Sequence, residues 1–162
     1  MSGTILCGVD GSTDSRLALH TAVRLAEELD SRLVVAHVVQ TALGTSPRFG
    51  IVSGATTIVS PLEQLEDGRR LLDGVLAEER VDDVERRVVH GFPADRLADL
   101  ADEVGAELIV VGSRGRGPVK AALLGSVSTE LIGVARCPVL VVPPGVVTDL
   151  AVQDAALARE AP

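Results

Sequence analysis

The stretch that decides the fold is residues 88–117, VVHGFPADRLADLADEVGAELIVVGSRGRG. It opens with the end of an apolar run and continues into 93–104, where apolar residues recur at helical spacing. Pro93 suits the first turn of a helix, and Gly105 is typical of a residue that ends one. A second apolar run, 108–111, then leads into a glycine-rich loop. The stretch therefore predicts a strand, a helix and a strand in succession.

The same alternation runs through the rest of the chain. Short apolar runs are rich in β-branched residues and nearly continuous, as expected of strands that helices cover on both faces. These runs lie at 4–9, 33–39, 84–89, 108–111 and 139–142, and segments of helical period lie at 14–30, 61–80, 93–104 and 129–135. Strands and helices that alternate with short links form parallel βαβ units with right-handed crossovers. The sequence thus predicts an α/β, doubly wound fold with a five-stranded parallel sheet and helices on both faces.

Length and composition set the domain organisation. A chain of 162 residues with 46% apolar and 23% charged residues can build one packed domain, which we place at residues 1–145. A loop rich in Gly, Ser and Thr interrupts it at 41–60 and is expected to be either a lid over a ligand or a mobile insertion. An acidic, Ala-rich C-terminal tail follows at 146–162.

The charge and the scarce residue types argue against several functions. A net charge of −8 disfavours a protein that coats DNA, RNA or an anionic membrane, and an aromatic content of 1% disfavours stacking on single-stranded nucleic acid. No run approaches the roughly 20 apolar residues of a membrane span. The chain begins without the basic residues of a secretory signal, and Cys7 and Cys137 are isolated, so we expect a cytoplasmic protein with reduced, buried thiols. His37 lies inside an apolar run and is expected to be a hydrogen-bonded core residue, and the histidines lack partners at the spacing of a zinc site.

The stretch most informative for function is residues 110–127, VVGSRGRGPVKAALLGSV. Glycines after a buried strand let backbone amides approach an anion closely. The segment GSVS at 125–128 precedes a helical run, and a helix N-terminus offers free N–H groups and the positive end of the helix dipole. Arg114, Arg116 and Lys120 add cations. These features favour a phosphate site over an ordinary connection between a strand and a helix.

Two familiar nucleotide motifs do not fit this stretch. Pro118 stands where the Walker A pattern requires Lys, and the dinucleotide pattern fails at Lys120 and follows the fourth strand instead of the first. The spacing that remains is Gly112, two residues, Gly115, nine residues, and then Gly125 with Ser126. No nucleophile with a base beside it can be identified, so no catalytic residue is predicted.

This spacing resembles the ATP-binding signature of the universal stress protein family. The first run with its turn, ILCGVDGSTDS, the second run, VVAHVV, the stretch quoted at the start, and the last run, ARCPVLVVP, also resemble that family, so the resemblance covers nearly everything from Thr4 to Pro143 except the long loop. It implies the strand order 3-2-1-4-5, which brings the carboxyl ends of the first and fourth strands together at the crevice where open α/β sheets bind ligands. It also implies a homodimer in which a second subunit covers Val139–Val142, an apolar strand at the sheet edge.

The resemblance further implies a site for ATP, with Mg²⁺ carried by the nucleotide. In ATP-binding members the carboxylate that matches Asp10 lies by the nucleoside and is a candidate magnesium ligand, and the backbone that matches Val38 meets the adenine edge. Arg114 and Arg116 would be auxiliary cations, while Pro118 departs from the small residue common in this loop and stiffens it. Asp10 also has a plainer interpretation, as a turn residue that caps the following helix. The complete expected site comprises Gly8, Val9, Asp10, Val38, Val111, Gly112, Ser113, Arg114, Gly115, Arg116, Gly117, Gly125, Ser126, Val127 and Ser128.

The function that the resemblance implies is that of an ATP-binding, nucleotide-responsive regulatory module in a stress or dormancy response, with an unknown protein partner. Two alternatives stay open. One is a slow ATPase or an adenylating enzyme of the same superfamily, for which DGSTDS at 10–15 is a partial match to a turn of the form SGG-x-D-S. The other is a dimeric scaffold that binds no nucleotide, against which the intact glycine spacing argues.

Overall fold

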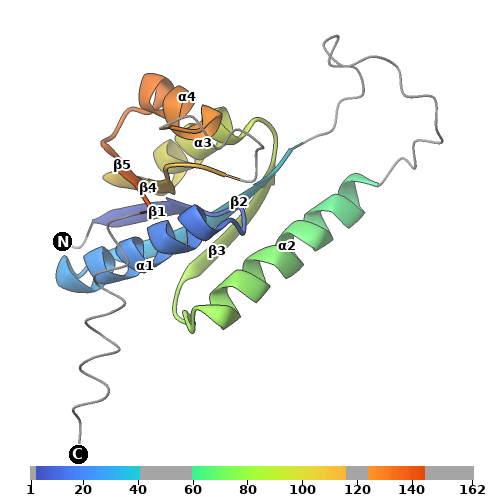
Figure 1. Cartoon of the computed structure of the whole chain (residues 1–162), viewed down its shortest axis with the longest axis horizontal. Coiled ribbons are helices and arrows are strands. Elements are labelled where there is room, and N and C mark those ends of the chain that lie inside the picture. Colours follow the sequence, from blue (N-terminus) through green and yellow to red (C-terminus); the bar gives the residue numbers. More distant parts are fainter. Residues whose placement is uncertain (1–2, 41–59, 116–123, 145–162) are drawn as a thin grey trace, which may run out of the picture.

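Parallel strands form one sheet in the described part of the chain, residues 3–40, 60–115 and 124–144 of a computed structural model. The strands are β1 (Thr4–Gly8), β2 (Arg32–Val39), β3 (Glu85–His90), β4 (Leu108–Gly112) and β5 (Val139–Val142), and the helices are α1 (Thr13–Glu28), α2 (Pro61–Glu78), α3 (Pro93–Val104) and α4 (Ser126–Val134). The five strands lie in the order β3-β2-β1-β4-β5, and every neighbouring pair is parallel. The predicted α/β fold and strand order are confirmed (Figure 1).

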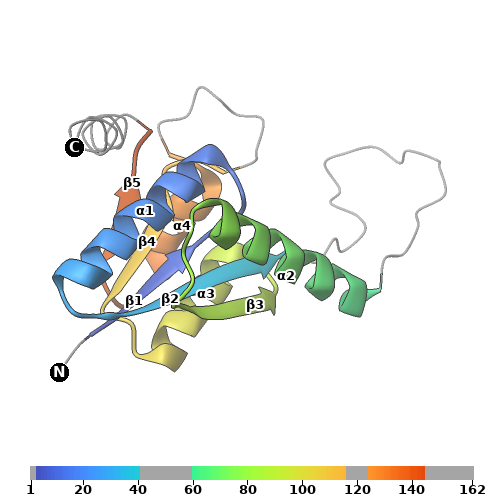
Figure 2. The ribbon, with the colours of Figure 1, turned by 90° about the horizontal axis from the view of Figure 1, so that it is seen from below.

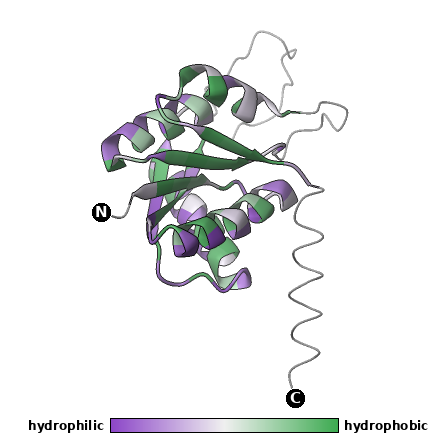
Figure 3. Cartoon of the chain, turned by 90° about the vertical axis from the view of Figure 1, so that its left-hand side faces the viewer, coloured by the Kyte–Doolittle hydropathy of each residue, from purple (hydrophilic) through white to green (hydrophobic). Residues whose placement is uncertain are grey.

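The helices cover the sheet on both faces. Helices α1 and α2 lie on one face and α3 and α4 on the other, as two perpendicular views show (Figures 1 and 2). Alternate residues of β1 therefore enter two different cores: Ile5 and Cys7 join the cluster under α1 and α2, and Leu6 joins the cluster under α3 and α4. Because both faces are buried, the central strands β1 and β4 are apolar along nearly their whole length (Figure 3), which is why the sequence shows continuous runs there and no alternation. The edge strand β3 differs, because it begins with Glu85, Arg86 and Arg87.

Helices α1 and α2 end at Glu28 and Glu78, two residues before the predicted positions 30 and 80. Asp30 and Arg80 adopt left-handed φ angles of 49° and 56°, which turn the chain out of the helix. Gly105 does the same after α3 with a φ of 65°, as its residue type predicts. Only the glycine was recognisable in the sequence, because Asp and Arg seldom adopt this conformation.

Helix α4 begins at Ser126, three residues before the predicted position 129. The carbonyl of Gly125 accepts the N–H of Thr129 at 3.1 Å, so the first helical hydrogen bond already forms there. Residues 126–128 therefore form the first turn of the helix, where backbone N–H groups have no partner within the helix.

The two cysteines differ in burial. Cys7 in β1 has no exposed surface, and burial raises the pKa of its thiol to about 12, which keeps it protonated at neutral pH. Cys137 is only partly buried, because it precedes the edge strand β5, so the prediction of a buried thiol is wrong there. Partial burial also raises the pKa of the Cys137 thiol. Both residues are free cysteines.

Two predicted segments lie outside the described residues. Of the long loop 41–60 only Ser60 is described, and its N–H donates to the Glu63 carboxylate at 2.9 Å at the start of α2. The tail 146–162 is not described at all. What the sequence indicates for the loop and for the tail therefore stays a prediction. Within the described ranges, no helix has the length and apolar character needed to cross a membrane.

Gly68 and Gly74 of α2 provide a test of how closely this helix approaches the sheet. A Cβ at position 68 would lie 2.7 Å from Val39 Cγ2 and 2.9 Å from Val88 Cγ1, whereas one at position 74 would meet nothing within 4 Å. We expect Gly68→Ala to lower the free energy of unfolding by about 1–2 kcal/mol, because α2 must move away from β2 and β3. Gly74→Ala should raise it by about 0.5–1 kcal/mol through helix propensity. Urea unfolding followed by circular dichroism measures both, and equal changes would contradict the close packing at Gly68.

Candidate functional site

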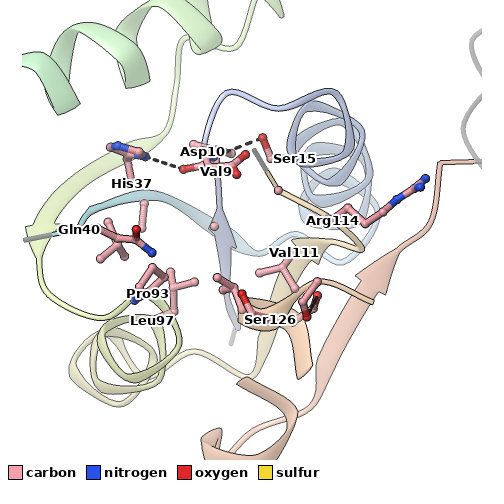
Figure 4. A pocket seen from close by; sticks show the side chains of 18 of the residues that line it. Val9, Asp10, Ser15, His37, Gln40, Pro93, Leu97, Val111, Arg114 and Ser126 are labelled. Atoms are coloured by element: carbon pink, nitrogen blue, oxygen red, sulfur yellow. Dashed lines mark hydrogen bonds between the residues drawn. The ribbon is translucent and has the colours of Figure 1, made fainter. Parts of the chain in front are cut away.

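The order of the strands creates a crevice between β1 and β4. After β1 the chain adds β2 and β3 on one side of the sheet, and it then returns to add β4 and β5 on the other. The helices that follow β1 and β4 lie on opposite faces, so the carboxyl ends of these two strands leave a gap between them. A cavity of about 630 Å³ lies at this position (Figure 4), a size typical of small-molecule sites.

Most of the predicted site residues that the structure describes line this cavity. They are Gly8, Val9, Asp10, Val38, Val111, Gly112, Arg114, Gly115, Gly125, Ser126, Val127 and Ser128. Ser113 is 2% exposed and does not line it, and Arg116 and Gly117 lie outside the described residues.

Eight lining residues were not predicted: Ser15, Ala36, His37, Val39, Gln40, Pro93, Leu97 and Leu124. The lining residues of β2 could have been predicted, because β2 pairs with β1 and ends at the same edge of the sheet. The lining residues of α3 could not, because only the packing of α3 over the sheet brings them to the crevice.

One part of the cavity is apolar. Pro93 and Leu97 from the first turns of α3 and Val111 from β4 point into it (Figure 4), and Leu97, Val111 and Val38 belong to one hydrophobic cluster. Gln40 at the end of β2 adds an amide group to the lining. An apolar slot with a few polar groups suits a flat heteroaromatic ring.

His37 is hydrogen-bonded, as predicted, yet it also lines the cavity. Its Nδ1 lies 2.8 Å from the Val9 carbonyl oxygen, which can only accept, so Nδ1 carries the proton of this bond. The side chain is only partly buried. The hydrogen bond links the ends of β1 and β2 at the rim of the site.

Asp10 follows β1 and forms a hydrogen-bonded turn into α1. Its Oδ1 accepts the N–H of Ser12 at 2.9 Å, and its own N–H donates to Ser15 Oγ at 3.3 Å. The helix cap itself is Ser12, whose Oγ accepts the N–H of Ser15 at 3.2 Å. Asp10 is therefore a turn residue that also lines the cavity, whereas the prediction that it caps the following helix is wrong, because Ser12 does so.

The first two glycines of the predicted spacing are needed for different reasons. A Cβ at Gly112 would lie 2.6 Å from the carbonyl carbon of Asp14 and 2.8 Å from the nitrogen of Ser15, both backbone atoms of α1. A Cβ at Gly115 would lie 2.6 Å from Asp10 Oδ2, the end of a side chain. Gly112 thus allows two backbones to pack closely, and Gly115 leaves room above the Asp10 carboxylate.

The N-terminus of α4 faces the cavity with three residues. Gly125, the N-cap, provides no side-chain cap, and the first-turn residues Ser126, Val127 and Ser128 line the cavity. The Ser128 hydroxyl donates to the carbonyls of Ser113 at 3.1 Å and Gly125 at 3.3 Å, whereas Ser126 is exposed. The Ser128 hydroxyl is therefore used inside the protein, and no side chain caps the N–H groups of this first turn. A helix start of this kind has the chemistry that favours an anion.

Arg114 is the one Arg or Lys among the described residues that line the cavity. Its Nε donates to Asp14 Oδ2 at 3.3 Å, and its side chain points away from the centre of the cavity (Figure 4). The Arg114 guanidinium is therefore engaged with α1. The described residues contain no group of three or more His, Cys, Asp or Glu side chains that could hold a metal ion.

Comparison with known proteins agrees with this geometry. The model of the universal stress protein family matches residues 1–143. The chain belongs to the universal stress protein family. Universal stress protein YxiE of Bacillus subtilis is 36% identical over 147 residues, which cover 88% of this chain and 99% of YxiE.

Solved structures of other universal stress proteins share this fold. UspA from Lactobacillus plantarum matches with a TM-score of 0.68 at 21% identity, over 86% of this chain and 97% of that protein. A universal stress protein in complex with cAMP matches with a TM-score of 0.63 at 27% identity, over 86% of this chain and 96% of that protein.

In this universal stress protein, Gly112 and Gly115 should respond differently to the same substitution. We expect Gly112→Ala to lower the free energy of unfolding by about 1–3 kcal/mol, because backbone must move away from backbone. Gly115→Ala should change it by less than about 0.5 kcal/mol, because only the Asp10 carboxylate must shift. That shift should appear as an NMR chemical-shift change at the Ser12 amide, which donates to Asp10. Equal destabilisation by the two substitutions would contradict these separate roles.

Proposed function

We propose that the chain binds an adenine nucleotide in the cavity, that the nucleotide is ATP with Mg²⁺, and that the protein is a regulatory module whose interactions change with nucleotide. The observation that carries this proposal is that an apolar slot and an uncapped helix N-terminus open into one cavity at the switch point of the sheet. The universal stress protein solved with cAMP supports an adenine nucleotide as the ligand. The cytoplasm is the compartment we propose.

The two parts of the cavity suggest how the nucleotide binds. The adenine would lie in the apolar slot beside Val38, Pro93 and Leu97, and the phosphates would accept hydrogen bonds from the first turn of α4. Asp10 lies between the strand ends and would face the ribose or the Mg²⁺ that arrives with the triphosphate. The proposed role is binding with at most slow hydrolysis, because no general base with an oriented water was identified in the sequence.

Titration calorimetry with Mg²⁺ and ATP, ADP, AMP or cAMP tests the ligand. We expect Ser126→Ala to weaken ATP binding by about 1–2 kcal/mol, because one hydroxyl donor is lost. Thr129→Ala is the matched control one turn along α4: its hydroxyl donates at 2.8 Å to the Gly125 carbonyl and does not line the cavity, so affinity should not change. Gly115→Val should abolish binding, because the larger side chain fills the space above Asp10.

Other outcomes would redirect this proposal. Equal affinity for cAMP and ATP would contradict a site built for a triphosphate, and absence of binding by every adenine nucleotide would favour the scaffold alternative. Turnover well above about one per minute that Asp10→Ala removes would favour the ATPase alternative, since enzymes commonly exceed this rate.

The two edges of the sheet differ, and this difference supports a homodimer through β5. Edge strand β3 carries Glu85, Arg86 and Arg87, charges that discourage pairing, whereas β5 is VLVV. The N–H groups of Ile109 and Ser113 donate to the carbonyls of Pro138 and Val142. Because strand residues alternate in direction, Val139 and Val141 direct their N–H and C=O groups to the free edge.

Val141→Pro tests this pairing. Proline removes one outward donor without removing a hydrogen bond to β4, so the fold should persist while a partner strand is lost. We expect Val141→Pro to sediment as a monomer and Val141→Thr, which keeps the N–H, to sediment as a dimer like the wild type. A dimeric proline variant with a normal circular dichroism spectrum would exclude this edge as the interface.

A further inference from the structure

The first residues of the glycine-rich loop, Ser113 and Arg114, are hydrogen-bonded to the first turn of α1. Asp14 Oδ2 accepts a hydrogen bond from Ser113 Oγ at 2.9 Å and one from Arg114 Nε at 3.3 Å. The Asp14 side chain is only 12% exposed, so its charge is largely withdrawn from water and Arg114 supplies the countercharge. Ser12 Oγ also lies 3.5 Å from the Arg114 carbonyl oxygen, which adds a weak second contact between turn and loop.

Ser113 transmits this attachment to α4. It is 2% exposed, and its N–H donates to the Val142 carbonyl at 2.9 Å. Its carbonyl accepts the N–H of Gly125 at 2.6 Å and the hydroxyl of Ser128 at 3.1 Å. Gly125 and Ser128 are the cap and the first turn of α4. Ser113 therefore connects Asp14, which it contacts through its hydroxyl, with the start of α4, which it contacts through its carbonyl.

We propose that Asp14 is a positioning residue for the nucleotide site, and that Arg114 serves as its countercharge and not as a phosphate ligand. This inference rests on the proposed function. Arg114 is one of the residues that line the cavity, but its side chain points away from the centre (Figure 4), and its Nε is already bonded to Asp14. Among the described residues that line the cavity, the groups left to receive the phosphates are the N–H groups of the first turn of α4 and the Ser126 hydroxyl, and the link from Asp14 through Ser113 holds this turn in place.

A double-mutant cycle with ligands of increasing charge separates the two roles of Arg114. The variants are Asp14→Asn, Arg114→Gln and the double variant, and the ligands are adenosine, AMP and ATP with Mg²⁺, measured by calorimetry. We expect Asp14→Asn and Arg114→Gln to weaken AMP and ATP by the same factor, about threefold to tenfold, and to leave adenosine within about twofold, because the first turn of α4 receives the phosphates. The double variant should lose little more, because both substitutions remove one link. If Arg114→Gln weakens ATP at least about tenfold more than Asp14→Asn does, Arg114 is a phosphate ligand and the proposal is overturned.

A second measurement needs no nucleotide. Hydrogen exchange of the Gly125 amide reports on its bond to the Ser113 carbonyl. Asp14→Asn should accelerate this exchange at least about tenfold and leave the buried Leu6 amide of β1 unchanged. Acceleration at both sites would indicate global destabilisation, and no acceleration at Gly125 would exclude positioning; either result overturns the proposal. If the wild type binds none of the three ligands, the proposed function fails, and this exchange still decides the role of Asp14 in the loop.

Asp102 and Arg136 form a matched control pair. Arg136 lies two residues beyond α4, and its Nη1 donates to Oδ2 of Asp102 in α3 at 2.8 Å. The Arg136 side chain is 83% exposed. Asp102→Asn and Arg136→Gln change the charge as the test variants do, but they should leave all three affinities within about twofold because exposed pairs contribute little. Affinity losses equal to those of Asp14→Asn would show an effect of charge alone and would count against positioning.

Discussion

The close contact between the end of β4 and the first turn of α1 is the constraint on which the site depends. Gly112 lets the two backbones meet, since any Cβ there would lie within 2.8 Å of α1 backbone atoms. The contact places the glycine-rich loop beside the Asp10 turn and lets Ser113 reach the carboxylate of Asp14. From Ser113 the same chain of hydrogen bonds continues to the start of α4. The same contact thus belongs both to the packing of α1 on the sheet and to the lining of the cavity.

The helices and strands could be predicted from the sequence because the patterns that indicate them are local. Apolar runs, helical periods and the stop at Gly105 each depend on residues close together in the chain. The order of the strands was not local information; it came from the resemblance to a family, since parallel strands joined by similar helices can be arranged in several ways. The helix ends at Glu28 and Glu78 were missed because the residues that turn the chain out of each helix, Asp30 and Arg80, are not glycines, and other residue types seldom adopt a left-handed conformation.

The site could be predicted only in part, because the sequence gives the type of each residue and not the contacts that it makes. Glycine at 112 and at 115 looks alike, yet one serves backbone packing and the other leaves space above a carboxylate. Serine likewise predicts a hydroxyl donor, but the hydroxyls of Ser113 and Ser128 are used inside the protein and that of Ser126 is exposed. The contribution of Leu97 required the packing of α3 over the sheet, for which no pattern in the sequence exists.

The electrostatics of the cavity follow from the same arrangement. The chain has a net charge of −8, and Asp10 lines the cavity, so neither net charge nor this carboxylate attracts an anion. The Arg114 guanidinium is bonded to Asp14, which leaves the fixed dipoles of α4 as the source of positive potential within the described lining. A dipole acts only over the first turn of its helix, so its effect depends on where that turn lies. An anion site of this kind relies on the placement of backbone more than on the number of cations. This dependence is why we expect the contacts at Gly112, Ser113 and Asp14 to influence the binding that we propose.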